Sequence, residues 1–444
     1  MVYTARQRRS SVLKSSTGEL MEMPENTASP FDVTILSQIR ECFCHVDSDP
    51  YSGSRIFLEN AGGALTLKRV VEVVAQQTAL PDNGGRKNPA SREIDRLIAK
   101  GRQDLRVLLG ARSGTILLGE STTSNAFRVL GGIIGNVAGS NVVTTNLDHP
   151  AIYDSTKILS ERFGKEWRVA TFEPHCGRVN ADAVARLVDA ETTVLALIHS
   201  SNITGARNDI YSIIQVARQI KPDLYVVVDG AQHGPHGLVD VEQLGCDAYF
   251  LSSYKLFSKV GASVAFLSER TARLPHDQIL GKPLTDWDLG TREQAGYAAW
   301  SEAVAYLCWL GARFTEAAEP RAQLQAAFEA IELHERALIS LLLRGGDGVK
   351  GLLELPHVRV YGVANDLQAR ESCVIFNVDA ISSGEVMAYL GEQGIRVHNR
   401  VSDAYSKHTL QALGIEECVR VSLAHYNTLA EVRAFLQAME KAGK

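Results

Sequence analysis

The chain has 444 residues, of which 45% are hydrophobic and 22% charged, a composition typical of a globular protein large enough for more than one domain. Its net charge of -5 gives no basic face of the kind that nucleic acids or anionic membranes require, so we expect neither as a partner. The seven cysteines include no C-x-x-C pair and no zinc-site spacing, which predicts no metal and indicates a reducing compartment.

The chain begins with a polar tail and a short helical segment. Residues 1–30 are rich in Ser, Thr, Glu and Pro and lack the apolar core of a secretory signal, which predicts a poorly ordered tail. Residues 31–54 form a predicted N-terminal helical segment, with its helix over 31–45. No window of about 18 uninterrupted apolar residues occurs, so the sequence predicts a cytoplasmic protein without a membrane span.

A large domain is predicted over residues 55–313, where short apolar runs alternate with helical patterns. A short strand at 55–63 runs into glycines. Continuously apolar strands are predicted within 114–120, 141–151, 192–202, 224–232, 248–255 and 261–268. Apolar strands separated by helices indicate an α/β fold with a mostly parallel sheet covered on both faces.

Polar side chains follow five of these strands, at the points where the strands end. In a parallel sheet, ligands bind beyond the carboxyl ends of the strands, so we expect these side chains to meet at one edge. They are Thr122, His149, Asn202, Asp229 and Lys255.

The pattern changes after residue 313. A long helical stretch over roughly 314–345 precedes apolar strands within 372–380, 394–401 and 418–423, with a helix between the first two and another at the end. Residues 314–444 therefore predict a linking helix and a smaller C-terminal α+β domain.

The residues at the sheet edge suit a pyridine cofactor. Asp229 ends an apolar strand and needs a cationic partner, and a protonated pyridine nitrogen is one that fits. Lys255, on a neighbouring strand, could form a Schiff base at the other end of the same ring. Thr122 and Thr123 at a helix start, with Ser252, could hold a phosphate.

Each of these residues also has a purely structural explanation. A lysine at a strand end usually extends into solvent, and Asp229 or the threonines could be helix caps. His149 could be a loop residue, and Arg420, which could clamp a carboxylate, could lie on an edge strand. Only their joint order and spacing favour a site.

Seven stretches carry a family resemblance between about residues 56 and 433. They are "FLENAGG", "GESTTSNAF", "NLDHPA", "HSSNITG", "VVVDGAQHGPHGLVDVEQLGCDAYFLSSYK", "DLGT" and "VRVSLAHYNT". In these the chain resembles the class V aminotransferase superfamily of fold-type I pyridoxal 5'-phosphate (PLP) enzymes, and within it the cysteine-desulfurase-like branch. The resemblance implies a seven-stranded-type sheet, PLP as cofactor and a homodimer with shared active sites.

The resemblance also implies a role for each matched residue. Lys255 would hold PLP as a Schiff base, Asp229 would pair with the pyridine nitrogen, and His149 would stack on the ring. Gln232 would bond the phenolic oxygen, Asn202 would lie over it, and Thr122, Thr123 and Ser252 would hold the phosphate. Gly290 and Thr291 would reach the phosphate of the partner subunit. The substrate would be bound by Asn202, Arg420, His398 and Arg400.

Two departures from the family pattern bear on the reaction. Desulfurases carry a nucleophilic cysteine shortly after the strand that matches 394–397, but residues 394–414 contain none, and Ser402 and Asp403 stand near its place. Without that thiolate no persulfide can form on the protein at this point. Tyr254 replaces the histidine usual before the lysine and resembles the aromatic residue of kynureninases.

The resemblance therefore favours a PLP-dependent enzyme that acts on an amino acid through an external aldimine, by β-elimination, C–S lyase or desulfurase-like chemistry. Transamination, kynureninase-like C–C hydrolysis and epimerisation stay open as alternatives. A non-catalytic PLP-binding regulatory subunit is the alternative from another class. A nucleotide-binding protein is disfavoured because no glycine-rich phosphate loop follows a predicted strand.

Overall fold

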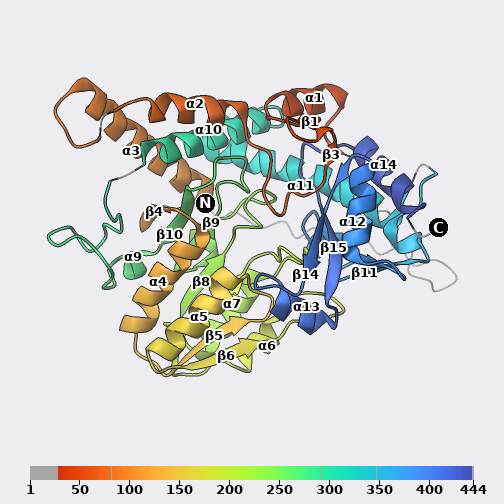
Figure 1. The fold of residues 1–444 in the computed structure, drawn as a ribbon. Coiled ribbons are helices and arrows are strands. Elements are labelled where there is room, and N and C mark those ends of the chain that lie inside the picture. Colours follow the sequence, from red (N-terminus) through yellow and green to blue (C-terminus); the bar gives the residue numbers. More distant parts are fainter. Residues whose placement is uncertain (1–28, 82, 292, 347, 443–444) are drawn as a thin grey trace, which may run out of the picture.

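The computed structural model describes residues 29–81, 83–291, 293–346 and 348–442. Nearly all of the tail predicted over 1–30 lies outside these residues. A large sheet with its helices occupies one side of the molecule, a smaller sheet the other, and the long helix α11 (Pro320–Arg344) connects them (Figure 1). No helix in the described part of the chain is both long and apolar enough for a membrane crossing.

The large sheet has seven strands in the order β4-β10-β9-β8-β7-β5-β6. Only β10 runs antiparallel to its neighbours β9 and β4, which confirms the mostly parallel α/β fold. The strands are β4 (Thr115–Gly119), β5 (Asn141–Thr145), β6 (Glu166–Ala170), β7 (Thr192–Ile198), β8 (Tyr225–Asp229), β9 (Ala248–Leu251) and β10 (Ser263–Leu267). Every residue of β5, β7, β9 and β10 is buried, as expected where helices cover both faces.

The helices that follow the parallel strands return the chain across the sheet, so the carboxyl ends of these strands lie at one edge of the large sheet. The helices of this domain are α4 (Thr122–Asn136), α5 (Pro150–Arg162), α6 (Ala181–Ala185), α7 (Ile210–Ile220), α8 (Val241–Leu244) and α9 (Glu269–Ala272). The helix α4 starts directly after β4 because Ser121 forms a capping box with Ser124. On the other side α2 (Lys68–Thr78), α3 (Pro89–Leu109) and α10 (Gln294–Gly311) pack together (Figure 1).

The smaller sheet is antiparallel, with the order β11-β12-β15-β14. Its strands are β11 (Val358–Tyr361), β12 (Cys373–Val378), β14 (His398–Val401) and β15 (Glu417–Ser422). The helices α12 (Ser383–Glu392), α13 (Lys407–Leu413) and α14 (Leu429–Met439) belong to the same region, as do the 3-10 turns η1 (Leu352–Glu354) and η2 (Leu367–Ala369). One apolar core joins this sheet to the second half of α11.

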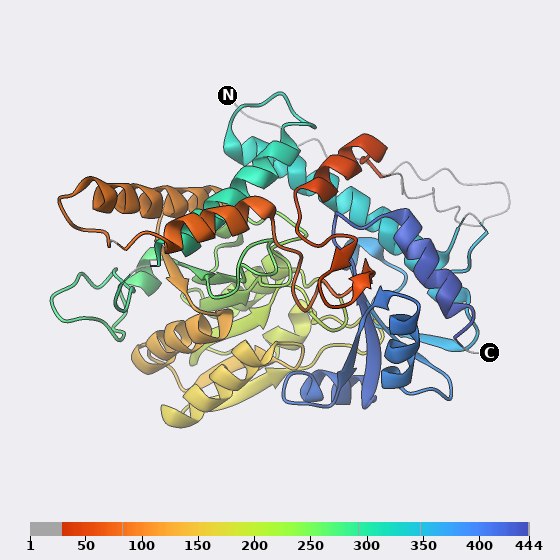
Figure 2. The same ribbon diagram turned by 45° about the horizontal axis from the view of Figure 1, so that its top comes forward.

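The N-terminal segment reaches across to the C-terminal part of the chain. It contains α1 (Val33–Glu41) and the short strands β1 (Ser48–Asp49), β2 (Gly53–Ser54) and β3 (Ile56–Phe57). The helix expected over 31–45 thus ends at Glu41. The strand β3 pairs in parallel with β13 (Ile395–Arg396), and Figure 2 shows the two segments side by side. Residues far apart in sequence thereby frame the edge of the large sheet.

Candidate active site

Side chains from the ends of several strands of the large sheet line one cavity. Eight residues expected from the sequence are among them: Thr122, Thr123, His149, Asn202, Asp229, Gln232, Ser252 and Lys255. Four further residues complete the lining: Ser121, Ile198, Ala231 and Tyr254. The structure therefore brings together the residues that follow β4, β5, β7, β8 and β9, because parallel strands end at the same edge.

Lys255 lies in the turn that follows β9 and is only 8% exposed. Its Nζ donates a hydrogen bond to Gln232 Oε1 at 3.3 Å. Burial lowers the pKa of Lys255 to about 8, although the nearby Asp229 favours the charged form. An amine with this pKa has a much larger neutral fraction near physiological pH than an ordinary lysine, and the neutral form is the one that attacks a carbonyl carbon.

Asp229 ends β8 and is 2% exposed. Its Oδ1 accepts a hydrogen bond from the Ala231 backbone N–H at 2.9 Å. Burial raises the pKa of Asp229, while this hydrogen bond and Lys255 act in the opposite direction. In the described ranges no arginine, lysine or histidine lies within ion-pair distance of this carboxylate. The carboxylate thus faces the cavity with the capacity to accept a proton-bearing nitrogen.

A cluster of hydroxyl groups stands at the first turn of α4. Thr122 Oγ1 lies 2.8 Å from Ser252 Oγ and 3.0 Å from Ser263 Oγ, and Ser263 Oγ donates to the Leu251 carbonyl at 2.7 Å. The free backbone N–H groups and the dipole of this helix also point toward this end. Hydroxyls and N–H groups at a helix start suit a phosphate.

His149 caps the N-terminus of α5 through its imidazole. Its Nδ1 accepts a hydrogen bond from the Ala151 backbone N–H at 3.1 Å, so a neutral ring carries its proton on Nε2. Burial and the nearby Lys255, Arg400 and His408 lower the pKa of His149 to about 3. The ring is therefore neutral at physiological pH and suited to contact a flat ligand by its face.

The residues expected to bind substrate lie on the small sheet, beside the cavity. Arg420 in β15 is 2% exposed, and its Nη1 donates to the Asn202 carbonyl at 2.9 Å. Its Nε is buried, and no group in the described residues forms a hydrogen bond with it. His398 lies directly opposite Arg420 on β14, and Arg400 follows two residues later. None of the three lines the Lys255 cavity itself.

Gly290 and Thr291 do not reach this cavity within one chain. Both are exposed, and they line a separate cleft with Ser124, Arg128 and Glu293. Gly290 has φ of 90°, a backbone conformation that favours glycine. Their expected role toward a partner subunit stays a prediction.

The sequence analysis missed some buried groups behind the site. Ser263 supports Thr122, yet only its hydroxyl in the otherwise apolar run "SVAFL" could have drawn attention to it. His233 lies 2.7 Å from Glu371, and His236 lies 2.7 Å from Glu335. These two histidine–glutamate pairs join the segment after Asp229 to α11 and to the start of the small domain, and no local sequence pattern indicates such contacts.

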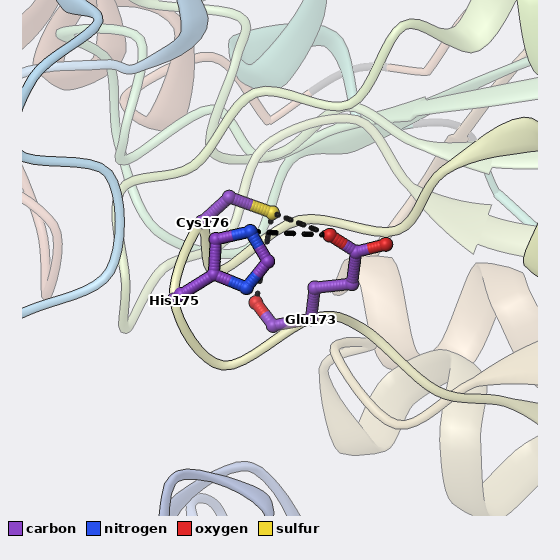
Figure 3. Close-up of side chains that lie close together, drawn as sticks. All are labelled: Glu173, His175 and Cys176. Carbon is purple, nitrogen blue, oxygen red and sulfur yellow. Dashed lines mark hydrogen bonds and ion pairs between the residues drawn. The ribbon is translucent and has the colours of Figure 1, made fainter.

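A separate group of possible metal ligands lies in the loop after β6. Figure 3 shows Glu173, His175 and Cys176, whose ligand atoms lie within 4.8 Å of one another. Glu173 Oε2 is 3.4 Å from His175 Nε2 and 3.7 Å from Cys176 Sγ. The sequence analysis predicted no metal from spacing alone. Because these side chains already contact one another and the His175 side chain is largely exposed, their proximity is explained without an ion.

The chemistry of the cavity fits PLP. Lys255 offers an amine of lowered pKa for the aldehyde carbon, and the buried Asp229 carboxylate, which forms no ion pair with the residues that the structure describes, could pair with a pyridine nitrogen. The hydroxyls of Thr122 and Ser252 offer donors for the phosphate. The neutral His149 ring suits the ring face.

Comparison with known proteins agrees with this chemistry over most of the chain. The family model described as aminotransferase class-V matches residues 56–435. Proteins described as cysteine desulfurases from Salmonella choleraesuis (strain SC-B67) and Salmonella typhi are 27% identical over 387 residues, which cover 84% of this chain and 84% of each relative.

Solved structures share the fold. A cysteine desulfurase from Thermococcus onnurineus NA1 superposes with a TM-score of 0.78 at 20% identity, covering 94% of this chain and 99% of that one. A cysteine desulfurase from Escherichia coli gives a TM-score of 0.73 at 22% identity, covering 92% and 98%. The fold of this chain is thus the fold of these structures.

Proposed function

The chain belongs to the aminotransferase class-V family of PLP-dependent enzymes, and on this basis we propose that it cleaves the bond between Cβ and sulfur of a cysteine-type amino acid. The observation that carries the proposal is the cavity in which Lys255 and Asp229 converge with the hydroxyl cluster. The named relatives are desulfurases, which supports sulfur chemistry over transamination, C–C hydrolysis or epimerisation.

Each residue has one task in this reaction. When bound, PLP supplies a ring that takes up the electron pair released at Cα. Asp229 would hold a proton on the ring nitrogen, and the neutral His149 ring would cover the ring face. Gln232 and Asn202 would serve the phenolic oxygen, while Thr122, Thr123 and Ser252 would hold the phosphate.

Arg420 and Lys255 act on the amino acid. Arg420 would bind the α-carboxylate, since among the described residues its guanidinium bonds to a backbone carbonyl and its Nε stays without a partner. This contact fixes the Cα–H bond relative to Lys255. The Lys255 amine would accept the Cα proton at Nζ, and its pKa of about 8 suits a general base near neutral pH.

Sulfur leaves without a protein persulfide at the loop where desulfurases carry their cysteine. Ser402 and Asp403 occupy this loop, and neither can take up sulfur. The buried Cys418 packs with Ile203, Ile375 and Leu410, and burial raises its pKa to about 12. A thiol with that pKa is not a nucleophile at neutral pH. The sulfur-bearing group therefore departs as a thiolate, and elimination is the reaction that results.

We also propose that two copies of the chain form a homodimer with shared active sites. Gly290 and Thr291 are exposed and stand away from the Lys255 cavity of their own chain, as residues that serve a partner would. Light scattering of the protein as it elutes from a size-exclusion column measures its oligomeric state. A cytoplasmic location is part of the same proposal, and it is supported by seven unpaired cysteines.

A spectrum combined with product assays tests the function. The purified protein should show the near-visible absorbance of lysine-linked PLP, and cysteine-type substrates should yield pyruvate, ammonia and a free thiol without any added 2-oxo acid. Amino-group transfer that requires a 2-oxo acid acceptor would instead establish an aminotransferase. A protein that cannot be reconstituted with PLP would overturn the proposal.

A further inference from the structure

Two arginines lie on the same face of the small sheet, next to the site. In the β14–β15 pair, Arg420 is directly opposite His398, and Arg400 is directly opposite Cys418. Opposite residues of an antiparallel pair point to the same side, and alternate residues of one strand do so as well. Arg420 and Arg400 are therefore diagonal neighbours, a relation in which long side chains come within reach of a common ligand.

This face is turned toward the large domain. Arg420 Nη1 bonds to the Asn202 carbonyl. On the neighbouring strand β12, Cys373 contributes to the same face, and its Sγ lies 3.5 Å from the Ile203 carbonyl. Beyond the end of β14, the ring of Tyr405 lies 6.1 Å from that of His149. Arg400 thus lies between Arg420 and the loop that borders His149.

Arg400 is an incompletely paired cation. Its side chain is 11% exposed, and Nη2 donates to Ser406 Oγ, which carries no charge. The Asp403 carboxylate is 3.9 Å away and 43% exposed, so it is a weak, solvated partner. The Nε is buried and has no hydrogen-bond partner in the part of the chain that the structure describes. A buried guanidinium in this state is costly unless a further anion binds it.

The α-carboxylate of the substrate accounts for only one of the two arginines. In the residues that the structure describes, Arg420 has no carboxylate within ion-pair distance, so one acid group would satisfy Arg420 and leave Arg400 unmatched. The pKa shifts of the neighbouring groups reflect this unmatched positive charge. Burial and Arg420 lower the pKa of Arg400, and Arg400 in turn helps to lower the pKa of both His149 and Lys255. The positive field thus extends into the cavity.

We propose that Arg400 binds a second acid group, carried by the substrate side chain, so that the enzyme acts on cysteine S-conjugates whose sulfur substituent bears a carboxylate. This proposal rests on the C–S cleavage proposed above. It also explains how sulfur leaves without a protein cysteine, because the leaving group is a thiol R–SH held at its carboxylate by Arg400.

The reaction is balanced and redox-neutral. The Cα–H bond and the Cβ–S bond break, the electron pair of the latter leaves with sulfur, and the thiolate takes up a proton. Water then hydrolyses the three-carbon remainder. One conjugate and one water thus give R–SH, pyruvate and ammonium, with no oxidant or reductant required.

A pair of substrates that differ only in charge tests the proposal. S-carboxymethyl-L-cysteine and S-carbamoylmethyl-L-cysteine have nearly the same shape, but only the first carries a second acid group. We expect the holoenzyme to show a kcat/KM at least about tenfold higher for the acid, and Arg400→Gln to remove this preference by lowering the acid value about 10- to 100-fold. The amide value should change less than about threefold, since a neutral ligand makes no charged contact with Arg400.

A matched variant separates a local contact from a general loss of charge. Arg359→Gln removes an exposed arginine from β11, the opposite edge strand of the same sheet, and should leave the preference intact. Equal losses for acid and amide in Arg400→Gln, or the same loss in Arg359→Gln, would overturn the proposal. If Arg400→Gln does not fold, the wild-type preference decides, because a holoenzyme that does not distinguish acid from amide contradicts it.

A binding measurement tests the role of Arg400 independently of the proposed function. Adipate has the same number of atoms between its carboxyl carbons as S-carboxymethyl-L-cysteine. Neither adipate nor its monoamide can react, so calorimetry with the purified protein reports recognition of two acid groups alone. Tighter binding of adipate, lost in Arg400→Gln, supports the Arg400 site even if C–S cleavage is not found. Cleavage of both conjugates with equal binding of the two inhibitors would leave the proposed function standing and refute the role of Arg400.

Discussion

The two sides of the site differ in how their polar groups are satisfied. On the large-domain side, hydroxyls and amides bond to one another, as in the contacts of Thr122 with Ser252 and Ser263 and of Lys255 with Gln232. On the small-domain side, Arg420 and Arg400 both keep a buried Nε that no described residue bonds. The first side is arranged before any ligand arrives, whereas the second needs an anion.

This difference matches two kinds of ligand. A cofactor that stays bound is best held by groups that are already oriented, since no ordering cost arises at each turnover. A substrate that comes and goes can supply the charge that the arginines lack. Loss of a large-domain group should therefore affect the cofactor first, and loss of a small-domain arginine should affect the substrate first.

The largest effect is expected for Lys255→Ala. Removal of the amine abolishes both covalent attachment of PLP and acceptance of the Cα proton, so activity should fall at least about 10³-fold. Borohydride reduction followed by peptide mass spectrometry should place the cofactor on Lys255 in the wild type and on no lysine in the variant. Lys259→Ala, which removes a partly exposed lysine paired with Glu293 at 3.2 Å, is the control and should keep the label. A lysine-linked chromophore in Lys255→Ala would refute the assignment.

The next effect tests the other side of the site. Arg420→Ala should raise the KM for the amino acid about 10²-fold, because charge-assisted hydrogen bonds to the α-carboxylate are lost, while the PLP spectrum stays unchanged. Arg420→Lys retains the charge without the planar fork of the guanidinium, so its KM should lie between those of the wild type and Arg420→Ala. Loss of cofactor with unchanged KM would mean that Arg420 belongs to the cofactor side after all.

The sequence predicted the cofactor side better than the substrate side. Asp229 and Lys255 follow apolar strands, and parallel strands deliver such residues to one edge, so their meeting follows from local patterns. The register of β14 against β15 is set by tertiary packing, and the sequence does not reveal that Arg400 and Arg420 share a face. The family resemblance named Arg400 as a substrate residue, but the incomplete pairing of its guanidinium became visible only in the structure.

Short pairings between distant segments were likewise beyond prediction. The strand β3 has two residues and pairs with β13, about 340 residues later, and so few residues carry no periodic signal. Ser263 and the His233–Glu371 contact depend on side chains that face each other across separate elements. Such contacts arise from the packing of whole layers and not from any one stretch.

A pH profile of cofactor binding gives a smaller, graded effect. The neutral amine of Lys255 reacts with the aldehyde, and a lysine pKa lowered to about 8 leaves about a tenth of the groups neutral at about pH 7 and about nine tenths at about pH 9. The rate at which PLP-free protein gains its lysine-linked absorbance should thus rise about tenfold over this range and then level off. A rate that keeps rising toward about pH 10 would indicate an ordinary, solvated lysine.

The smallest effect is expected behind the hydroxyl cluster. Ser263→Ala removes one of two hydroxyl partners of Thr122, and the net value of such a bond is about 1 kcal/mol, so PLP affinity should fall about fivefold with KM unchanged. Ser268 directly follows β10, the strand that contains Ser263, and it caps α9. Ser268→Ala should therefore lower stability without changing PLP affinity. If Ser263→Ala changed KM and left PLP affinity intact, the hydroxyl cluster would serve the substrate. The assignment of the large-domain side to the cofactor and of the small-domain side to the substrate would then be wrong.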